Sequence, residues 1–440
     1  MMRRASSSGF TLVELMVSLV AGLIIAIGVV GLATTATASF HEQARISTTE
    51  NAVRTAAQRL RYDLSRVSFM STGNIRLASM DPPDPQPPFG QRVAHAVGNG
   101  GNATPRYPGT ANLQGLRIRV GGSRDGSNPP AGAEGPNNLS TNNGLNPDDI
   151  FITGNLTTTD AYQGHWRGNG ACGGPAIILD SRADPAVRRL MNTGNPLAAV
   201  QNAFQPVAAR DFLARLVDMR NCEHFVPVCA VATPDAFTAV ISLRPAGDGI
   251  ALLPPTNQSS GAGAEGCGGT ETEQFSISPV HKVRWYIGPN TQAVLNPDPV
   301  LDADGASLPA PGAPEIVAEY AVDLKFGIVV ENPLLAPPNN IQVFDLDSDP
   351  GGGSIDLWTQ PVSGTIVNGP GPQRVRSVRF RIATRAAIPD RTANLIVPPG
   401  APYLSRYCLE NSAPASCTRF ARVRTIVSEV ALLNQASMRY

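Results

Sequence analysis

The chain has 440 residues, of which 42% are hydrophobic, so it is long enough to bury a substantial core in one large domain or in several smaller ones. Lysine plus arginine number 35, as do aspartate plus glutamate, and this balance excludes a general basic field that would attract nucleic acid or anionic lipid. The 42 glycines and 39 prolines show no collagen-like period and predict many turns and long irregular connections.

The N-terminus consists of a short basic leader followed by an apolar stretch. Arg3 and Arg4 are the only charged residues before Gly9, and residues 12–32 are apolar apart from Glu14 and one serine. At a rise of about 1.5 Å per residue, this stretch is long enough to cross a hydrocarbon core of about 30 Å. The leading arginines favour a cytoplasmic N-terminus, which places the rest of the chain on the opposite side of the membrane.

An ordinary secretory signal peptide is the alternative interpretation, with cleavage at the small residues Ala36-Thr37-Ala38. Two features oppose it. The apolar stretch is longer than the roughly 7 to 15 residues that are usual for a signal peptide. Glu14 also lies within it, and an acid at the centre of a bilayer costs about 2.5 to 3.5 kcal/mol, so it usually has a functional role there.

Gly9 followed by Phe10-Thr11-Leu12-Val13-Glu14-Leu15 resembles the class III signal of type IV pilins and type II secretion pseudopilins. The resemblance implies that prepilin peptidase removes residues 1–9 by cutting between Gly9 and Phe10, and then N-methylates Phe10. Residues 10–34 would form a helix that lies first in the membrane and later in a filament core. Glu14 would pair with the N-terminal amine of a neighbouring subunit and set the axial register, because each charge is costly in hydrocarbon when it is unpaired.

Residues 35–70 are predicted to continue this helix beyond the membrane. Apolar residues recur at steps of three and four, at Val53, Ala57, Leu60, Leu64 and Val67. The charged residues nearby fall largely on other faces of the helix, at Arg54, Arg59, Arg61 and Asp63. The pattern predicts that one side of this segment packs against a globular head formed by residues 71–440.

The head is predicted to be an antiparallel sheet with large loop insertions, which makes the fold class α+β and pilin-like. Proline-rich residues 81–89 end the helical pattern, and residues 98–146, rich in glycine, asparagine and proline, predict a long loop. The predicted strands are Leu116–Val120, Asp149–Thr153, Ala176–Asp180, Phe237–Leu243, Val280–Ile287, Val322–Val330, Val375–Ala383 and Val423–Leu433. Residues 185–219, which include Leu213 and Leu216, predict one or two short helices.

The segment VRSVRFRIA gives the clearest strand pattern. Val378, Phe380 and Ile382 alternate with Arg379 and Arg381. Because successive side chains of a strand point to opposite faces, the pattern predicts one apolar face and one solvated face.

Two later segments extend the resemblance. Residues 316–328 (IVAEYAVDLKFGI) and 375–386 (VRSVRFRIATRA), followed by a closing strand that contains arginine, resemble the PilW family of minor pilins. The resemblance implies a structural subunit that primes or caps type IV pilus assembly. Its partners would be other minor pilins, the major pilin, prepilin peptidase, the assembly platform and a tip adhesin. The precursor would span the inner membrane once with its head in the periplasm, and the assembled subunit would lie in the surface pilus.

Two other functions remain open. A GspJ-like pseudopilin of type II secretion shares the same N-terminus, although pseudopilin heads are usually smaller, and a tip adhesin is compatible with the large insertions. An enzyme is not expected, because the chain has no GxSxG, GxxxxGK or HExxH motif. No nucleophile motif accompanies His41, His95, His165 or His281.

Export would place the six cysteines in an oxidising compartment, which predicts disulfides. Proximity in the sequence suggests the pairs Cys222–Cys229 and Cys408–Cys417, which leaves Cys172–Cys267 as the third. A zinc site formed by Cys222, His224 and Cys229 is the alternative for that segment, but the paired CxxC spacing of such sites is missing.

The segment DLDSDPGGGSID places acids at the first, third, fifth and twelfth positions of a calcium-binding loop, at Asp345, Asp347, Asp349 and Asp356. Pro350 stands where that loop requires glycine, and its last ligand is aspartate instead of glutamate. An acidic turn is therefore the preferred interpretation, with calcium binding as the alternative. No other cofactor is expected.

Overall fold

The computed structural model describes residues 11–71, 115–121, 145, 147–167, 170–205, 212–218, 223–243, 274–288, 292–298, 315–332, 335–346, 354–359, 371–387, 389, 406–409 and 419–436. The chain divides into two compact units, Met1–Asn51 and Ala52–Tyr440. The predicted leader and the predicted cleavage site between Gly9 and Phe10 lie outside the described residues.

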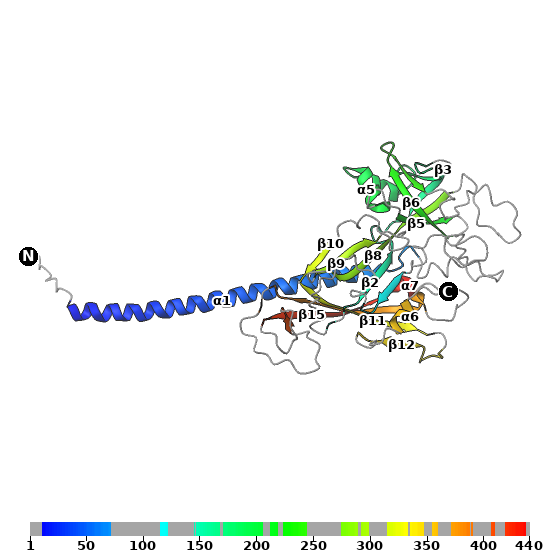
Figure 1. Ribbon diagram of the computed structural model, residues 1–440. Helices are drawn as coiled ribbons and strands as arrows, with labels where there is room; N and C mark the ends of the chain where they lie inside the picture. Colours follow the sequence, from blue (N-terminus) through cyan, green and yellow to red (C-terminus); the bar gives the residue numbers. More distant parts are fainter. Residues whose placement is uncertain are drawn as a thin grey trace, which may run out of the picture. The chain divides into compact units, whose positions relative to one another are not determined.

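One continuous helix, α1 (Leu12–Ser65, 54 residues), begins in the first unit and ends in the second (Figure 1). No proline interrupts it, so every interior residue retains the backbone N–H that the helical ladder needs. The helix is followed by turns from Arg66 to Met70, where Ser68 and Met70 have φ angles of 58° and 49°. A left-handed backbone cannot continue a right-handed helix, so the helix does not extend through these turns. The apolar stretch and its amphipathic continuation thus form one helix, as predicted.

The predicted stripe of α1 is buried. Val53, Ala57, Leu60, Leu64 and Val67 are each exposed by 4% or less, and they belong to one hydrophobic core with residues of the sheets. The amphipathic period therefore identified the face that packs against the head correctly.

Asp63, which was predicted to lie on another face than the apolar stripe, is nevertheless buried. It is only 3% exposed, its Oδ2 accepts a hydrogen bond from Trp285 Nε1 at 3.0 Å, and Arg59 Nε lies 3.7 Å from its Oδ1. The carboxylate is buried because a partner 222 residues away in the sequence satisfies it, and helical periodicity cannot reveal such a partner.

One layer of the head is an antiparallel sheet in which β2 and β9 flank the second half of β8. Its strands, in spatial order, are β1 (Leu116–Arg119), β2 (Asp149–Gly154), β8 (Gln274–Gly288), β9 (Gln292–Asp298) and β10 (Glu315–Glu319). Ile118, Ile150 and Trp285 from its three first strands are fully buried and share the core with α1. The sheet therefore covers the stripe of the helix.

The first half of β8 belongs to a small closed barrel. Its strands pair in the circle β8, β3 (Tyr162–Arg167), β4 (Ala176–Asp180), β7 (Thr238–Leu243), β6 (Glu223–Ala232), β5 (Phe212–Asp218) and back to β8, and every pairing is antiparallel. Closure removes the unpaired edges that an open sheet of this size would have. A second hydrophobic core, separate from that of α1, fills this region.

Two short helices pack against the barrel core, α4 (Pro185–Met191) and α5 (Pro196–Phe204). Each begins with a proline preceded by a capping residue: Asp184 accepts from the backbone N–H of Ala186, and Asn195 accepts from that of Ala198. A side-chain cap followed by proline is a strong signal for a helix start. The two short helices predicted in this region are confirmed.

Leu213 and Leu216 correct that prediction at its C-terminal end, because they lie in strand β5 and not in a helix. Their spacing of three residues fits a helix. In the structure, however, Leu213 lies opposite Pro227 on β6 and Val280 on β8, and both leucines are fully buried. Cross-strand partners that are distant in the sequence decided the conformation.

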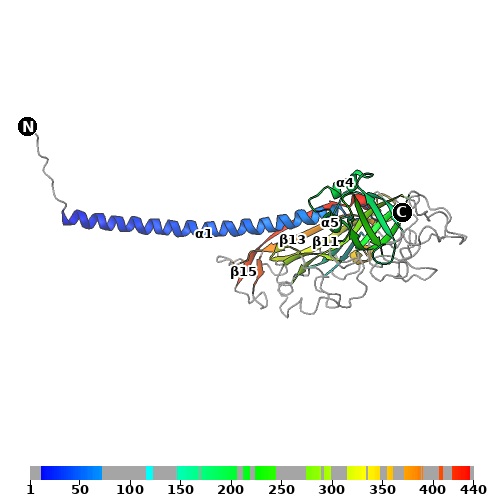
Figure 2. The same cartoon turned by 90° about the horizontal axis from the view of Figure 1, so that it is seen from above.

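The remaining layer is a five-stranded antiparallel sheet in the order β12 (Ile341–Phe344), β11 (Ala321–Glu331), β13 (Val375–Arg385), β15 (Phe420–Ala431) and β14 (Arg406–Cys408). Figure 2 shows its central strands β11, β13 and β15 side by side. Three short helical elements accompany it, α6 (Ser354–Thr359), the 3-10 helix η5 (Pro372–Arg374) and α7 (Leu433–Ala436). Val378, Phe380 and Ile382 are fully buried in the α1 core, so the apolar face of β13 is confirmed.

The opposite face of β13 is only partly solvated, which corrects the prediction for Arg381. Arg379 is half-exposed, but Arg381 is 8% exposed and its Nε donates to Asp323 Oδ2 at 2.7 Å. A carboxylate from the neighbouring strand β11 allows this guanidinium to be buried.

The head is therefore an antiparallel β structure that follows a long N-terminal helix, and the α+β, pilin-like fold class is confirmed. Each predicted strand segment overlaps an observed strand, but β8 begins six residues before the predicted Val280, and Leu433, the predicted end of the last strand, lies in α7. Strands β3, β5, β6, β9, β10, β12 and β14 were not predicted.

Candidate functional site at the N-terminal helix

A reciprocal pair of side chains fixes the start of α1. Thr11 precedes the first helical residue, and its Oγ1 accepts a hydrogen bond from the backbone N–H of Glu14 at 3.3 Å. In return, Glu14 Oε2 accepts from the backbone N–H of Thr11 at 3.0 Å and from its hydroxyl at 2.9 Å. This is a capping box, in which two N–H groups that the helix itself cannot satisfy find side-chain acceptors.

The capping role of Glu14 was missed in the sequence analysis, although a signal for it exists. Thr11 and Glu14 have the Ser/Thr-x-x-Glu/Gln spacing of a capping box and stand directly before an apolar run. A carboxylate near the first helical N–H groups also interacts favourably with the helix dipole. Glu14 therefore has a local partner within its own chain.

The first half of α1 exposes its apolar side chains on all sides of the helix. Its large hydrophobic residues from Leu12 to Leu32 are each at least 55% exposed. A soluble protein rarely leaves so large a continuous apolar surface uncovered. This helix is long and apolar enough to cross a membrane. None of its most apolar stretch is buried against the described part of the chain.

The threonines that follow the apolar run donate their hydroxyl hydrogens to backbone carbonyls of the same helix. Thr34 and Thr35 both donate to the carbonyl of Gly31 at 2.9 Å, and Thr37 donates to the carbonyl of Ala33 at 2.8 Å. In hydrocarbon each unsatisfied polar group costs several kcal/mol, so these bonds keep the end of the run compatible with an apolar environment.

Residues 4–30 match the family described as the prokaryotic N-terminal methylation motif. The chain carries a type IV prepilin-like N-terminus. No curated protein and no solved structure matches the chain. The matched residues include Gly9, Phe10 and Glu14, so the motif supports a pilin-like or pseudopilin protein that the peptidase processes. Motif and apolar helix together fit an inner-membrane-anchored pilin-like protein.

The C-terminal end of α1 is bound to strand β2 of the head. Arg66 Nη1 donates to the carbonyl of Leu156 at 2.8 Å, and Ser68 N donates to that of Thr153 at 2.9 Å. Gly154 makes this approach possible, because a Cβ at that position would lie 2.6 Å from the Arg66 carbonyl oxygen. Asn434, near the other end of the chain, donates to the carbonyl of Ser65, the last residue of the helix, and to that of Val67 in the turn that follows.

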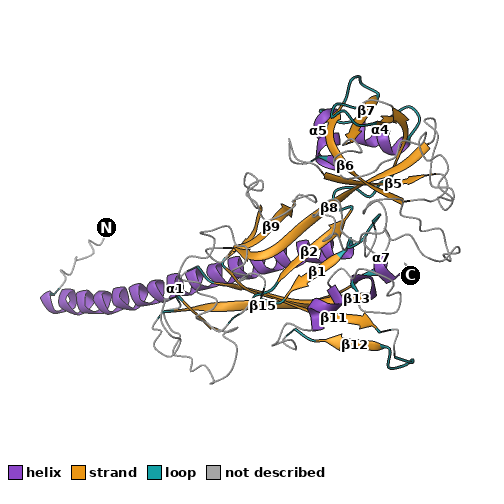
Figure 3. Ribbon diagram, turned by 45° about the vertical axis from the view of Figure 1, so that its right-hand side comes forward, coloured by secondary structure: helices purple, strands orange, loops and turns teal. Residues whose placement is uncertain are grey.

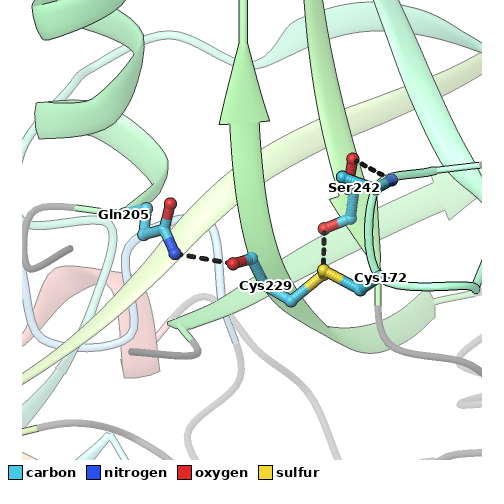
Figure 4. Close-up of a disulfide and its surroundings, with 5 residues drawn as sticks. Cys172, Gln205, Cys229 and Ser242 are labelled. Carbon is cyan, nitrogen blue, oxygen red and sulfur yellow. Dashed lines mark hydrogen bonds between the residues drawn. A yellow bond between two sulfur atoms is a disulfide. The ribbon is translucent and has the colours of Figure 1, made fainter. Parts of the chain in front are cut away.

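The cysteine pairing differs from the prediction. Cys172 is bonded to Cys229, with a Cα–Cα distance of 6.6 Å (Figure 4). The predicted pairs Cys222–Cys229 and Cys172–Cys267 are therefore wrong. Proximity in the sequence was misleading, because the barrel brings the segment before β4 against β6, and a hydrogen bond from that segment to β7 holds it there. Gln205 Nε2 donates to the carbonyl of Cys229 at 2.7 Å, and Ala171 N donates to Ser242 Oγ at 3.0 Å.

Cys408 also forms a disulfide, and no described cysteine is free. Its partner lies outside the described residues, as do Cys222, Cys267 and Cys417. The pair Cys408–Cys417 stays a prediction.

The structure bears differently on the two metal sites considered, zinc and calcium. Cys229 is oxidised, so it cannot supply a thiolate to the zinc site considered for Cys222 and His224. For calcium, Asp347 and Asp349 lie outside the described residues, while Asp345 Oδ1 lies 3.4 Å from Arg379 Nη1 and Asp356 falls in α6. No group of three potential metal ligands occurs in the part of the chain that the structure describes. Calcium binding stays a prediction.

Proposed function

We propose that this chain is a minor pilin of the PilW type, which primes or caps type IV pilus assembly together with other minor pilins. One observation carries the proposal. The first half of α1 exposes its apolar side chains, begins with the capping box of Thr11 and Glu14, and overlaps the prepilin motif. Such a helix needs lipid before assembly and the helices of other subunits afterwards.

Glu14 has a further proposed role in assembly. Its local partner Thr11 is neutral, and removal of residues 1–9 would create a positive α-amine one residue before Thr11. The carboxylate would then exchange its capping contact for the N-terminal amine of an adjacent subunit. That pairing would remove most of the penalty of holding each charge in an apolar filament core.

The proposed role is structural and requires no catalytic group or cofactor. Two features support the pilus over the type II secretion alternative. The head is larger than is usual for pseudopilins, and segments 316–328 and 375–386, which resemble PilW, coincide with β10, β11 and β13 of its sheets. The major pilin, other minor pilins, prepilin peptidase and the assembly platform would be its partners, and the pilus surface its final location.

A tip adhesin is a second candidate, favoured by the barrel. Its six strands enclose a core of their own, with α4 and α5 packed on it, apart from the core that holds α1. A separate module of this kind is better suited to recognising a surface than to packing against other subunits. The two roles are compatible, because a priming subunit at the tip also reaches external ligands first.

The experiment is to delete the gene and complement it with the full-length chain carrying Glu14→Gln. Deletion is expected to reduce surface pili, counted by electron microscopy, and wild-type chain to restore them. E14Q is expected to be cleaved and N-methylated at Phe10, as mass spectrometry of the mature N-terminus would show, but to be at least about tenfold depleted from sheared pili. Loss of one buried, paired charge accounts for a change of that size.

Ser18→Ala is the matched control, because Ser18 is exposed on the same segment and its hydroxyl donates to the carbonyl of Leu15 in its own helix. It is expected to assemble like the wild-type chain. Normal pilus numbers in the deletion strain together with lost protein secretion would favour the pseudopilin. A mature chain that begins after Ala38 would remove the basis of both functions.

A further inference from the structure

Strand β12 is an open edge of the five-stranded sheet (Figure 3). Its residues pair with β11 on one side, from Ile341 opposite Glu331 to Phe344 opposite Ile328. Among the described strands, none pairs with its other side. Every second residue of an edge strand directs its N–H and C=O groups outward, so this edge presents backbone donors and acceptors to the surroundings.

The composition of β12 differs from that of the other described edges. Natural edge strands are usually protected from strand addition by charged side chains, above all lysine. Strands β1, β10 and β14 and the outer part of β15 each contain arginine or glutamate. The sequence of β12, IQVF, contains no charge and no proline. The usual protection is therefore missing at this edge.

The outer face of β12 is apolar as well as open. Ile341 and Val343 are 49% and 57% exposed, and the neighbouring loop adds Leu335, which is 39% exposed. Gln342 and Phe344 point the other way, and Phe344 packs against the α1 core. Two exposed β-branched residues at a spacing of two are the side-chain pattern that a neighbouring strand covers best.

One carboxylate lies near each end of β12, Glu331 on the neighbouring strand β11 and Asp345 directly after β12. Glu331 lies opposite Ile341, and Asp345 follows Phe344, with side chains that are 36% and 68% exposed. Glu331 forms an ion pair with Arg376 at 2.6 Å, and Asp345 Oδ1 lies 3.4 Å from Arg379 Nη1. A partner whose basic residues flank an apolar centre would complement both ends.

We propose that β12 binds an extended segment of another protein by strand addition. The segment has β-branched residues at alternate positions, which cover Ile341 and Val343, and a lysine or arginine near each end, which faces Glu331 and Asp345. Backbone hydrogen bonds supply affinity, and the side-chain alternation and flanking charges supply specificity. The proposal does not depend on which pilin-like role the chain has.

The test uses the full-length chain in detergent micelles and a fluorescent peptide, Lys-Thr-Val-Thr-Val-Thr-Lys. Anisotropy is expected to show saturable binding, and hydrogen exchange is expected to slow at the backbone amides of residues 341–344. Val343→Lys is expected to weaken binding at least about tenfold, because it places a charge on the covered face. The same loss is expected for a peptide N-methylated at alternate residues, which cannot complete the ladder.

Val427→Lys is the matched control. Val427 is 59% exposed on the same face of the same sheet, but it lies on β15 at the other side. It is expected to change affinity less than twofold. The proposal would be overturned if V427K lost as much peptide affinity as V343K, or if the N-methylated peptide bound as tightly as the unmodified one. Unchanged hydrogen exchange at residues 341–344 would also overturn it. So would self-association of the wild-type chain that V343K abolishes, because the occupant would then be a second copy. A peptide with glutamate ends that binds equally well would overturn the charge assignment.

Discussion

Buried charges in the head are held by partners from distant parts of the chain. Asp63 on α1 meets Trp285 on β8, and Arg381 on β13 meets Asp323 on β11. In each case burial would be strongly unfavourable without the partner, because an ion removed from water loses its hydration. Such residues fix how neighbouring elements fit together, and single substitutions report on them.

Asp63→Leu is expected to destabilise the chain by about 1 to 3 kcal/mol, because it leaves the buried Trp285 N–H without its acceptor. Asp63→Asn should retain most of the stability, since an amide oxygen can still accept that bond. Urea unfolding of the full-length chain in micelles, followed by tryptophan fluorescence, measures both. If D63N loses as much as D63L, the carboxylate charge matters more than its hydrogen bond to the indole.

Leu60→Ala tests the apolar stripe directly. Leu60 is fully buried in the core between α1 and the sheets, so truncation is expected to cost about 2 to 5 kcal/mol, from lost burial plus a cavity. Gln58→Ala is the control, since Gln58 is exposed on the same helix and should change stability by less than about 0.5 kcal/mol. Similar unfolding midpoints for the two variants would mean that α1 is not held by this face.

At the scale of elements, β8 connects the barrel to the sheet that covers α1. Its residues up to Val280 pair with β3 and β5, and those from His281 onward pair with β2 and β9. His281 stands at this change of partners, 5% exposed, with its ring 6.1 Å from that of Phe212. Neither ring nitrogen completes a hydrogen bond, although the Ala203 carbonyl lies nearby.

Burial lowers the pKa of His281 from 6.5 to about 4, and the positive charge of Arg66 adds to the effect. In the unfolded chain this histidine binds a proton near pH 6.5, whereas the folded chain resists protonation until about pH 4. Acidification through that window therefore favours unfolding, by up to about 3 kcal/mol.

Urea midpoints between pH 7.5 and pH 4 should show this loss in the wild-type chain and a much flatter dependence in His281→Leu. His165→Gln is the control, because His165 is exposed on β3. An unchanged pH slope in H281L would assign the dependence to other groups.

At the scale of the whole molecule, the head contains two main hydrophobic cores, one around α1 and one in the barrel. The Cys172–Cys229 bond lies in the barrel and closes a loop between residues 57 apart. Because the bond restricts the unfolded chain, replacing both cysteines with serine is expected to cost about 2 to 4 kcal/mol.

The loss of stability should be concentrated in the barrel. Hydrogen exchange should accelerate at β4, β6 and β7 more than at β11 and β13 in the double variant. Non-reducing peptide mapping of the wild-type chain should recover Cys172 linked to Cys229. Recovery of a Cys222–Cys229 peptide instead would contradict the structure.

Features that depend on residues close together in the sequence could be predicted, and those that depend on distant residues could not. Local patterns predicted α1, the stripe from Val53 to Val67, the helices in residues 185–204 and the strand at 375–383, because each depends on a short period or on a cap. The strand that contains Leu213 and Leu216 and the pairing of Cys172 were predicted wrongly, and the burial of Asp63 was not foreseen, because their partners are distant in the chain. The capping role of Glu14 was readable but overlooked.

Local sequence patterns were sufficient for the N-terminal segment up to Ser65, which carries a prepilin-like motif and forms one helix whose first part is apolar on all sides. The helix follows from composition and from helical geometry within a few turns, whereas the motif was identified by its resemblance to a known family. Only the tertiary structure decided how β8 divides its length between a closed barrel and an open sheet, which cysteines meet, and which edge strand is left without protection. Those features depend on strand partners that are distant in sequence, and backbone pairing carries almost no signature in the residues between them.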